Sequence, residues 1–286
     1  MENHHSHNHH HGPHEGVDSA AMAELLDLDA NVLHSYLSDV TTWVRQLATD
    51  IPRRRVLDLG AGTGTGTIAL AERFSRADVI AVDVSEEMLT RVQDKALFGG
   101  FAERVRTVQA DLNVAWPPIE PVDVVWAALS LHEMDDPEQV LKDVFTTINP
   151  GGLLAVAEMD SPPRFLPDDI GLGRPGLEAR CHDALEQAQA SWEPHPDWGP
   201  HMERTGFTIV AKRTFPIDVT PPHPASTGHY ARAYLRLIRP VLEGRMATDD
   251  LATLGTLLAD DGPHSLLHRN DLIVRGTRTA WVARRP

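Results

Sequence analysis

Short, continuous apolar runs alternate with segments of helical periodicity through the middle of the chain. The apolar runs are RRRVLDLG, DVIAVDV, VRTVQADL, VDVVWAALSL and LLAVAEM. Runs of this length are typical of strands that are buried on both faces of a parallel sheet. Between them, TIALAERF, SEEMLTRVQDKAL and DPEQVLKDVFTTI predict helices, two of which begin after the N-cap residues Ser85 and Asp136. This alternation predicts a doubly wound α/β sheet with right-handed crossovers.

The pattern changes on both sides of this region. From Ala20 to Ala48 the apolar residues follow a helical period and predict two helices, with a break near 27–31. After Asp160 two segments alternate as strands, TIVAKRTFPIDVT and LIVRGTRTAWVARR, and helical segments precede and separate them. We therefore predict a tail at 1–18, lid helices at 19–50, a core at 51–160, a helical insertion at 161–204, and the last two strands at 205–286 with a second insertion near 228–260.

Four aromatic residues of these outer segments are candidates for lining a pocket, with packing in the core as the competing role for each. They are Trp192, Trp198, Tyr230 and Tyr234.

Composition narrows the class of protein. The 286 residues carry a formal net charge of −15, which argues against a nucleic-acid substrate, because phosphate contacts need clustered Lys and Arg. Cys181 is the single cysteine, so the chain has neither an internal disulfide nor a thiolate metal cluster. No stretch approaches the roughly 20 apolar residues of a membrane span. We predict a cytoplasmic protein without a membrane partner.

The N-terminal stretch MENHHSHNHHHGPHEG contains seven of the sixteen histidines. Neutral imidazole binds Zn, Ni or Cu, so we expect this segment to bind divalent metal adventitiously. The competing interpretation is a disordered, low-complexity leader.

The stretch VLDLGAGTGTGTIAL raises the question of which cofactor its glycines serve. A dinucleotide site requires G-x-G-x-x-G, and the third glycine would fall at Thr65. The chain instead has Asp58-x-Gly60-x-Gly62-x-Gly64. A carboxylate at Asp58 would repel a diphosphate but could attract an amino group, directly or through water.

This stretch resembles the first motif of the class I S-adenosylmethionine-dependent methyltransferases. The match continues in order, because VIAVDVSEEML resembles the second motif, VQADL the third, and the segment from Pro121 to Glu158 the fourth and fifth strands. The resemblance covers roughly Arg55 to Glu158. It implies a Rossmann-like sheet of seven strands, mostly parallel with the last one antiparallel, and S-adenosylmethionine as the cofactor.

The resemblance also implies roles for individual residues. Asp83 would bind both ribose hydroxyls, Val84 and Met88 would flank the adenine, Asp111 would meet the adenine amino group, and Leu112 would lie against the ring. The remaining residues expected at the cofactor are Asp58, Gly60, Gly62, Thr63, Gly64, Ala127 and Leu129.

Methyl transfer is an in-line displacement, so the protein mainly aligns a nucleophile, excludes water and removes a proton where one must leave. The residues after the fourth strand face the reaction, and His132 is the candidate general base, with packing under the cofactor as the alternative. No metal site is predicted. The absence of a basic RNA-binding domain favours O- or N-methylation of a small molecule such as a secondary metabolite. A non-catalytic S-adenosylmethionine-binding protein and a protein or RNA methyltransferase remain alternatives, and a homodimer remains open.

Overall fold

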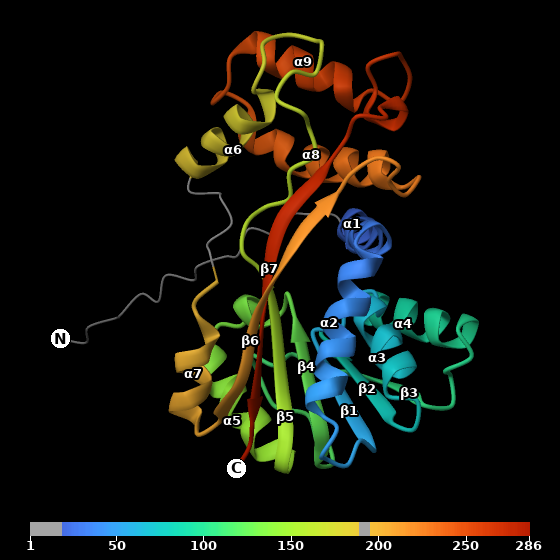
Figure 1. Ribbon diagram of the computed structural model, residues 1–286, viewed down its shortest axis with the longest axis vertical. Helices are drawn as coiled ribbons and strands as arrows, with labels where there is room; N and C mark the ends of the chain where they lie inside the picture. The colour runs from blue at the N-terminus through green and yellow to red at the C-terminus, as the bar shows by residue number, and fades with distance from the viewer. Residues whose placement is uncertain (1–18, 189–194) are drawn as a thin grey trace, which may run out of the picture.

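The computed structural model describes residues 19–188 and 195–286, so the predicted tail and Trp192 lie outside the described residues (Figure 1). Seven strands form one sheet in the order β3-β2-β1-β4-β5-β7-β6. All neighbours pair in parallel except β7, which is antiparallel to both β5 and β6. This arrangement confirms the predicted fold class. The strands are β1 (Arg55–Leu59), β2 (Asp78–Asp83), β3 (Val105–Gln109), β4 (Val122–Ala128), β5 (Ile148–Met159), β6 (Thr208–Val219) and β7 (Val274–Arg284).

Helices cover both faces of the sheet. On one face α2 (His34–Leu47), α3 (Thr65–Arg73) and α4 (Glu86–Phe98) share a buried cluster with residues of β1, β2 and β4. On the other face α5 (Pro137–Thr147) and α7 (Trp198–Thr205) pack against the sheet, and Trp198 is fully buried there. Trp198 therefore packs in the core between α7 and the sheet.

A second hydrophobic cluster, which we call the outer cluster, is formed by helices that lie beyond the carboxyl ends of the parallel strands (Figure 1). It joins α1 to helices from both insertions, and it contains the buried rings of Tyr230 and Tyr234. Of the segment 161–204, α6 enters this cluster, whereas α7 lies beside α5 on the sheet. The elements of the cluster are α1 (Ser19–Val32), α6 (Leu177–Gln187), α8 (Thr227–Leu242), α9 (Thr248–Leu258) and the short 3-10 turn η2 (Leu266–His268).

Most of the helix ends lie where the sequence predicts them. The Ser85 side chain accepts a hydrogen bond from the Met88 N–H at 3.3 Å, and Asp136 accepts one from the Gln139 N–H at 2.9 Å, as the predicted N-caps require. The break between the first two helices falls at Leu33, just beyond the expected stretch 27–31. There the side chain of Leu33 is buried in the second cluster, which helical periodicity alone does not reveal.

Within the described ranges, none of the helices combines the length and the apolar character that crossing a membrane requires.

Candidate functional site

The glycine-rich turn connects β1 to α3 and leaves no room for side chains. Gly60, Gly62 and Gly64 have φ angles of +65°, +51° and +84°, a region that L side chains rarely adopt. A Cβ at Gly60 would lie 2.4 Å from Cβ of Ser130, and one at Gly64 would lie 2.8 Å from the Val92 side chain. The backbone of this turn is therefore bare, which allows a ligand to approach it closely.

Asp83 ends β2 and faces the same turn. One of its carboxylate oxygens accepts the Gly62 N–H at 2.8 Å, and the other accepts the Ser85 N–H at 2.9 Å. A carboxylate oxygen has two acceptor positions, so each keeps one for a further donor such as a ribose hydroxyl. The two backbone bonds fix the orientation of the carboxylate.

Asp58 lies beneath the turn rather than in it. Its side chain is buried and accepts a hydrogen bond from the Thr67 hydroxyl at 2.6 Å. Burial, opposed by this bond and aided by the charge of Asp83, raises the pKa of Asp58 to about 7. The buried Thr63 hydroxyl, by contrast, has no hydrogen-bond partner among the described residues, which is a property expected of a group that meets a ligand.

The residues expected around the adenine differ in exposure. Val84 is 60% exposed, whereas Met88 is buried on the first turn of α4. Asp111 is exposed and accepts the Asn113 N–H at 3.0 Å, and Leu112 is half-buried against the sheet. Val84 thus offers an apolar surface beside Asp83 that the protein itself leaves uncovered.

The chain leaves β4 through a strained turn next to the glycines. Ala127 is buried in the sheet, and Leu129 has a φ of +53°, an unusual value for a residue with a branched side chain. The buried Ser130 hydroxyl then donates to the carbonyl of Leu59 at 2.7 Å. This bond ties the segment after β4 to the glycine-rich turn, and the next residues form the 3-10 turn η1 (Leu131–Glu133).

His132 lies in η1 between two carboxylates. Its Nδ1 is 2.8 Å from Glu158 Oε2, and its Nε2 is 3.0 Å from Glu133 Oε1. Burial alone would lower the pKa of His132, but the hydrogen bonds and charges of Glu133 and Glu158 outweigh it and raise the pKa to about 9. The imidazole is therefore charged at neutral pH.

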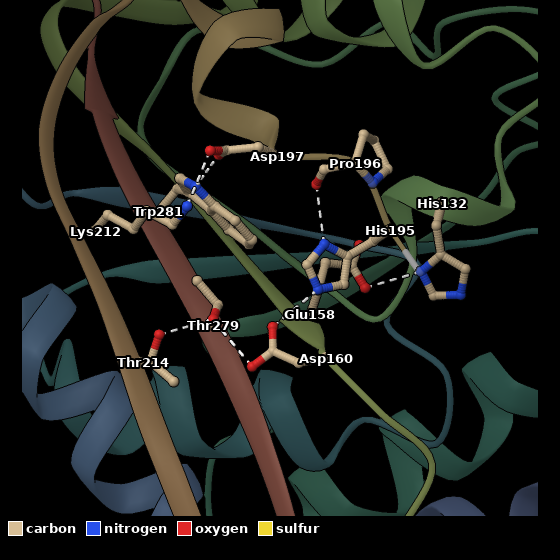
Figure 2. Close-up of polar contacts among 10 residues, drawn as sticks. All are labelled: His132, Glu158, Asp160, His195, Pro196, Asp197, Lys212, Thr214, Thr279 and Trp281. Atoms are coloured by element: carbon tan, nitrogen blue, oxygen red, sulfur yellow. Dashed lines mark hydrogen bonds and ion pairs between the residues drawn. The ribbon is translucent and has the colours of Figure 1, made fainter. Parts of the chain in front are cut away.

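Glu158 is the main site residue that sequence reasoning missed. It is the last residue but one of the apolar run LLAVAEM, and a carboxylate near the carboxyl end of a buried strand is the signal that could have identified it. Its side chain is fully buried, and its second oxygen, Oε1, has no hydrogen-bond partner within the part of the chain that the structure describes. Figure 2 shows Glu158 between His132 and His195 at the end of β5.

Leu26 on α1 also escaped prediction. Its side chain would lie 3.3 Å from a Cβ at Gly62, so α1 lies directly over the glycine-rich turn. Within the part of the chain that the structure describes, no group of three or more His, Cys, Asp or Glu side chains could hold a metal ion.

Together, the bare glycine turn, the two open acceptor positions of Asp83 and the exposed Val84 fit a nucleoside ligand. The absence of a third glycine at position 65 distinguishes the turn from a dinucleotide site.

Comparisons with known proteins identify relatives of this chain. The methyltransferase-domain family model matches residues 56–152. The malonyl-[acyl-carrier protein] O-methyltransferase of Halorhodospira halophila is 31% identical over 80% of this chain and 68% of its own length. The trans-aconitate 2-methyltransferase of Azoarcus sp. is 36% identical over 42% of this chain, but the match spans only 46% of that protein, so the chain covers about half of it.

Solved structures agree in fold. A proposed methyltransferase from Bacillus halodurans has a TM-score of 0.53 at 16% identity, over 86% of this chain and 98% of that chain. The YcgJ protein from Bacillus subtilis has a TM-score of 0.51 at 15% identity, over 85% and 97%. With the ordered motifs and the curated relatives, these findings show that the chain belongs to the class I S-adenosylmethionine-dependent methyltransferase family.

Proposed function

We propose that the protein transfers a methyl group from S-adenosylmethionine to an oxygen or nitrogen atom of a small molecule. The observation that carries this proposal is that the glycine-rich turn, Asp83 and the turn after β4 lie together at the carboxyl edge of the sheet. The glycine-rich turn and Asp83 supply a nucleoside site, and Ser130 fastens the turn bearing His132 beside it. The sulfonium of the bound cofactor supplies an activated methyl group, and this chain aligns the acceptor with it.

The proposed cofactor contacts follow the geometry of the edge. Asp83 would accept bonds from the ribose hydroxyls, while Val84 and Met88 would flank the adenine. Asp111 and Leu112 would meet its amino group and its ring. Because Asp58 is buried and already bonded to Thr67, we propose that it acts on the cofactor amino group through the turn or a water rather than by direct contact. The backbone of the turn, the Thr63 hydroxyl, Ala127 and Leu129 would surround the methionine part.

The outer cluster would act as a lid over this edge. It contains α1, which lies over the glycine-rich turn, and helices from both insertions. This cluster is built from apolar side chains, which suits a small acceptor enclosed beneath it better than RNA. The relatives support this class, because their names include methyltransferases of trans-aconitate, of 27-O-demethylrifamycin SV and of a malonyl group on a carrier protein.

Calorimetry and a turnover assay test the proposal. We expect S-adenosylmethionine to bind in the micromolar range with no measurable binding of NAD. The purified protein with S-adenosylmethionine and the low-molecular-weight fraction of a cell extract should then release S-adenosylhomocysteine. Binding of NAD without binding of S-adenosylmethionine would contradict the proposal. Binding without turnover would favour the non-catalytic alternative, and turnover that requires the macromolecular fraction would favour a protein or RNA substrate.

A further inference from the structure

The state of His132 bears on the kind of acceptor that the site can take. Both ring nitrogens face carboxylate oxygens, at 2.8 Å from Glu158 and 3.0 Å from Glu133. A carboxylate accepts and does not donate, so both nitrogens must carry a proton for both contacts to be hydrogen bonds. Glu133 on η1 and Glu158 on β5 are the charged groups that raise the pKa of His132 to about 9. An imidazolium is a donor and a cation, and it cannot accept a proton.

The two carboxylates differ in how firmly they are held. Glu158 is fully buried and belongs to β5, a central strand of the sheet, whereas the side chain of Glu133 is 37% exposed on a short turn. Glu133 is the more accessible of the two partners, so it is the one that an anion from solvent can replace. Removing Glu158 would instead require unpacking the sheet. The position at Nε2 is therefore the replaceable one.

Among the described residues, the nearest other charged pair on this side of β5 is His195 with Asp160. On the same side of β5, His195 Nε2 pairs with Asp160 at 3.1 Å, and His195 Nδ1 lies 2.9 Å from the carbonyl of Pro196. Asp160 also accepts a hydrogen bond from the Thr279 hydroxyl at 3.1 Å (Figure 2). His195 and Asp160 thus satisfy each other, and His132 remains the cation next to the turn that follows β4.

The geometry points to a carboxylate as the methyl acceptor. The substrate carboxylate takes the place of Glu133 at Nε2 of His132. The charged His132, which Glu158 orients, then anchors the substrate. This inference rests on the proposed function and narrows its acceptor to one class. It assigns His132 a role other than the general base that the sequence predicts.

Methylation of a carboxylate oxygen needs no general base. A carboxylic acid with an ordinary pKa near 4 is already ionised at neutral pH. One carboxylate oxygen forms a bond to the methyl carbon as the carbon–sulfur bond breaks, and the electron pair of that bond stays on sulfur. The negative acceptor and the positive sulfonium become a neutral ester and a neutral thioether, and no proton leaves. An alcohol or an ammonium group would have to lose a proton, which a charged His132 cannot take.

The first test identifies which kind of bond the transferred methyl group forms. The protein is incubated with S-adenosylmethionine labelled in the methyl group and with the low-molecular-weight extract fraction, and the product is then treated with mild alkali. A methyl ester releases its label as volatile methanol, whereas methyl ethers and methylamines keep it. Volatile label is the expected result, and alkali-stable label would overturn the inference while leaving the proposed function intact. Absence of cofactor binding would instead refute the proposed function.

The second test measures the protonation of His132 and does not depend on turnover. Nitrogen-15 NMR, with the His132 signal assigned from its loss in His132→Asn, should show a protonated ring up to at least pH 8. Glu133→Gln should lower the pKa of His132 by about one unit or more, and malonate, used as a carboxylate probe, should raise it again. The control Glu138→Gln removes an exposed carboxylate that pairs with Arg204 on α7, and it should change nothing. A neutral His132 at pH 7 in the unaltered protein would overturn the inference.

The pH dependence of label transfer separates the two roles of His132. An anchor must stay charged, so transfer should be flat between about pH 6 and 8 and should fall about tenfold per pH unit above 9. A general base must lose its proton first, so transfer would rise with pH up to about 9 and then level off. A rising profile would overturn the inference.

Discussion

Asp58 and Asp83 end neighbouring strands and differ in what surrounds them. Asp83 is bonded by two backbone N–H groups and keeps acceptor positions free, whereas Asp58 is buried under the turn with one hydroxyl donor. The carboxylate of the second motif therefore faces outward with acceptor positions for a ligand, whereas burial raises the pKa of the carboxylate of the first motif to about 7. Each predicts a different consequence of substitution.

For Asp83, we expect the change to alanine to weaken S-adenosylmethionine binding by roughly 1.5–3 kcal/mol, the usual value of hydrogen bonds to a charged group. Thermal stability should also fall, because the N–H groups of Gly62 and Ser85 lose their acceptor. Calorimetric titration measures the affinity. The control Asp78→Ala changes the other end of β2 and should leave the affinity unchanged. An unaltered dissociation constant in Asp83→Ala would show that this residue does not touch the ribose.

For Asp58, the raised pKa predicts a loss of stability with rising pH. The folded protein binds a proton up to about pH 7, whereas the unfolded chain releases it near pH 4, so the free energy of unfolding falls between these values. Asp58→Asn keeps an acceptor for Thr67 and cannot ionise. We expect it to gain roughly 2–4 kcal/mol relative to the unaltered protein between pH 5 and 8, the value of two to three pKa units.

Urea unfolding at the two pH values measures this difference. The exposed Asp94→Asn on α4 is the control and should follow the unaltered protein. Parallel stability curves for Asp58→Asn and the unaltered protein would contradict an elevated pKa.

At the scale of elements, α1 is the helix most directly placed over the predicted cofactor site. Its Leu26 lies over Gly62, Asp27 forms an ion pair with Lys95 of α4 at 2.5 Å, and Asp29 accepts a hydrogen bond from Tyr230 of α8 at 2.6 Å. Asp29 also pairs with the buried Arg278 of β7 at 2.5 Å. These polar contacts add to the apolar packing of α1 in the second hydrophobic cluster, and a helix that packs outside the sheet can open while the sheet stays intact.

We therefore expect Tyr230→Phe to loosen α1 selectively. The substitution keeps the edge-on packing against Phe165 and removes the hydroxyl that donates to Asp29. Hydrogen exchange followed by mass spectrometry should show α1 exchanging at least several-fold faster, with β1 and β4 unchanged, because a hydrogen bond to a carboxylate contributes about 1.5–3 kcal/mol.

Tyr234→Phe is the matched control, since Tyr234 lies on the same helix and packs against the same Phe165 ring. Equal exchange in α1 of both variants would mean that the Tyr230 hydroxyl does not hold the helix.

At the scale of the molecule, the described residues form a sheet with two covered faces and a further cluster beyond its carboxyl edge. The segment before residue 19 has no apolar period that would let it bury surface. Deleting residues 1–16 should leave the melting temperature and S-adenosylmethionine affinity unchanged, and it should remove most adventitious metal measured by elemental analysis. A large drop in melting temperature would show that this segment packs against the rest of the protein.

The sequence predicts those parts of this arrangement that depend on neighbouring residues. Apolar runs, the N-caps at Ser85 and Asp136 and the spacing of the glycines are local, so the strands, two helix starts and the turn could be located. Contacts between distant segments could not. Glu158 meets His132 across 26 positions, Leu26 reaches the turn from α1, and α7 packs beside α5 although it belongs to the predicted insertion. No periodicity records such pairings.

The long pairing of β6 with β7 limits how the outer cluster can move. The two strands pair in continuous register from Ala211 with Val282 to Val219 with Val274, and Val274 and Ile217 are already buried among the outer helices. The insertion that contains α8 and α9 thus stands on a stiff two-stranded stem rather than on a flexible linker. The insertion therefore gives α1 a rigid surface to pack against, and access for cofactor and acceptor depends on how readily α1 separates from α8.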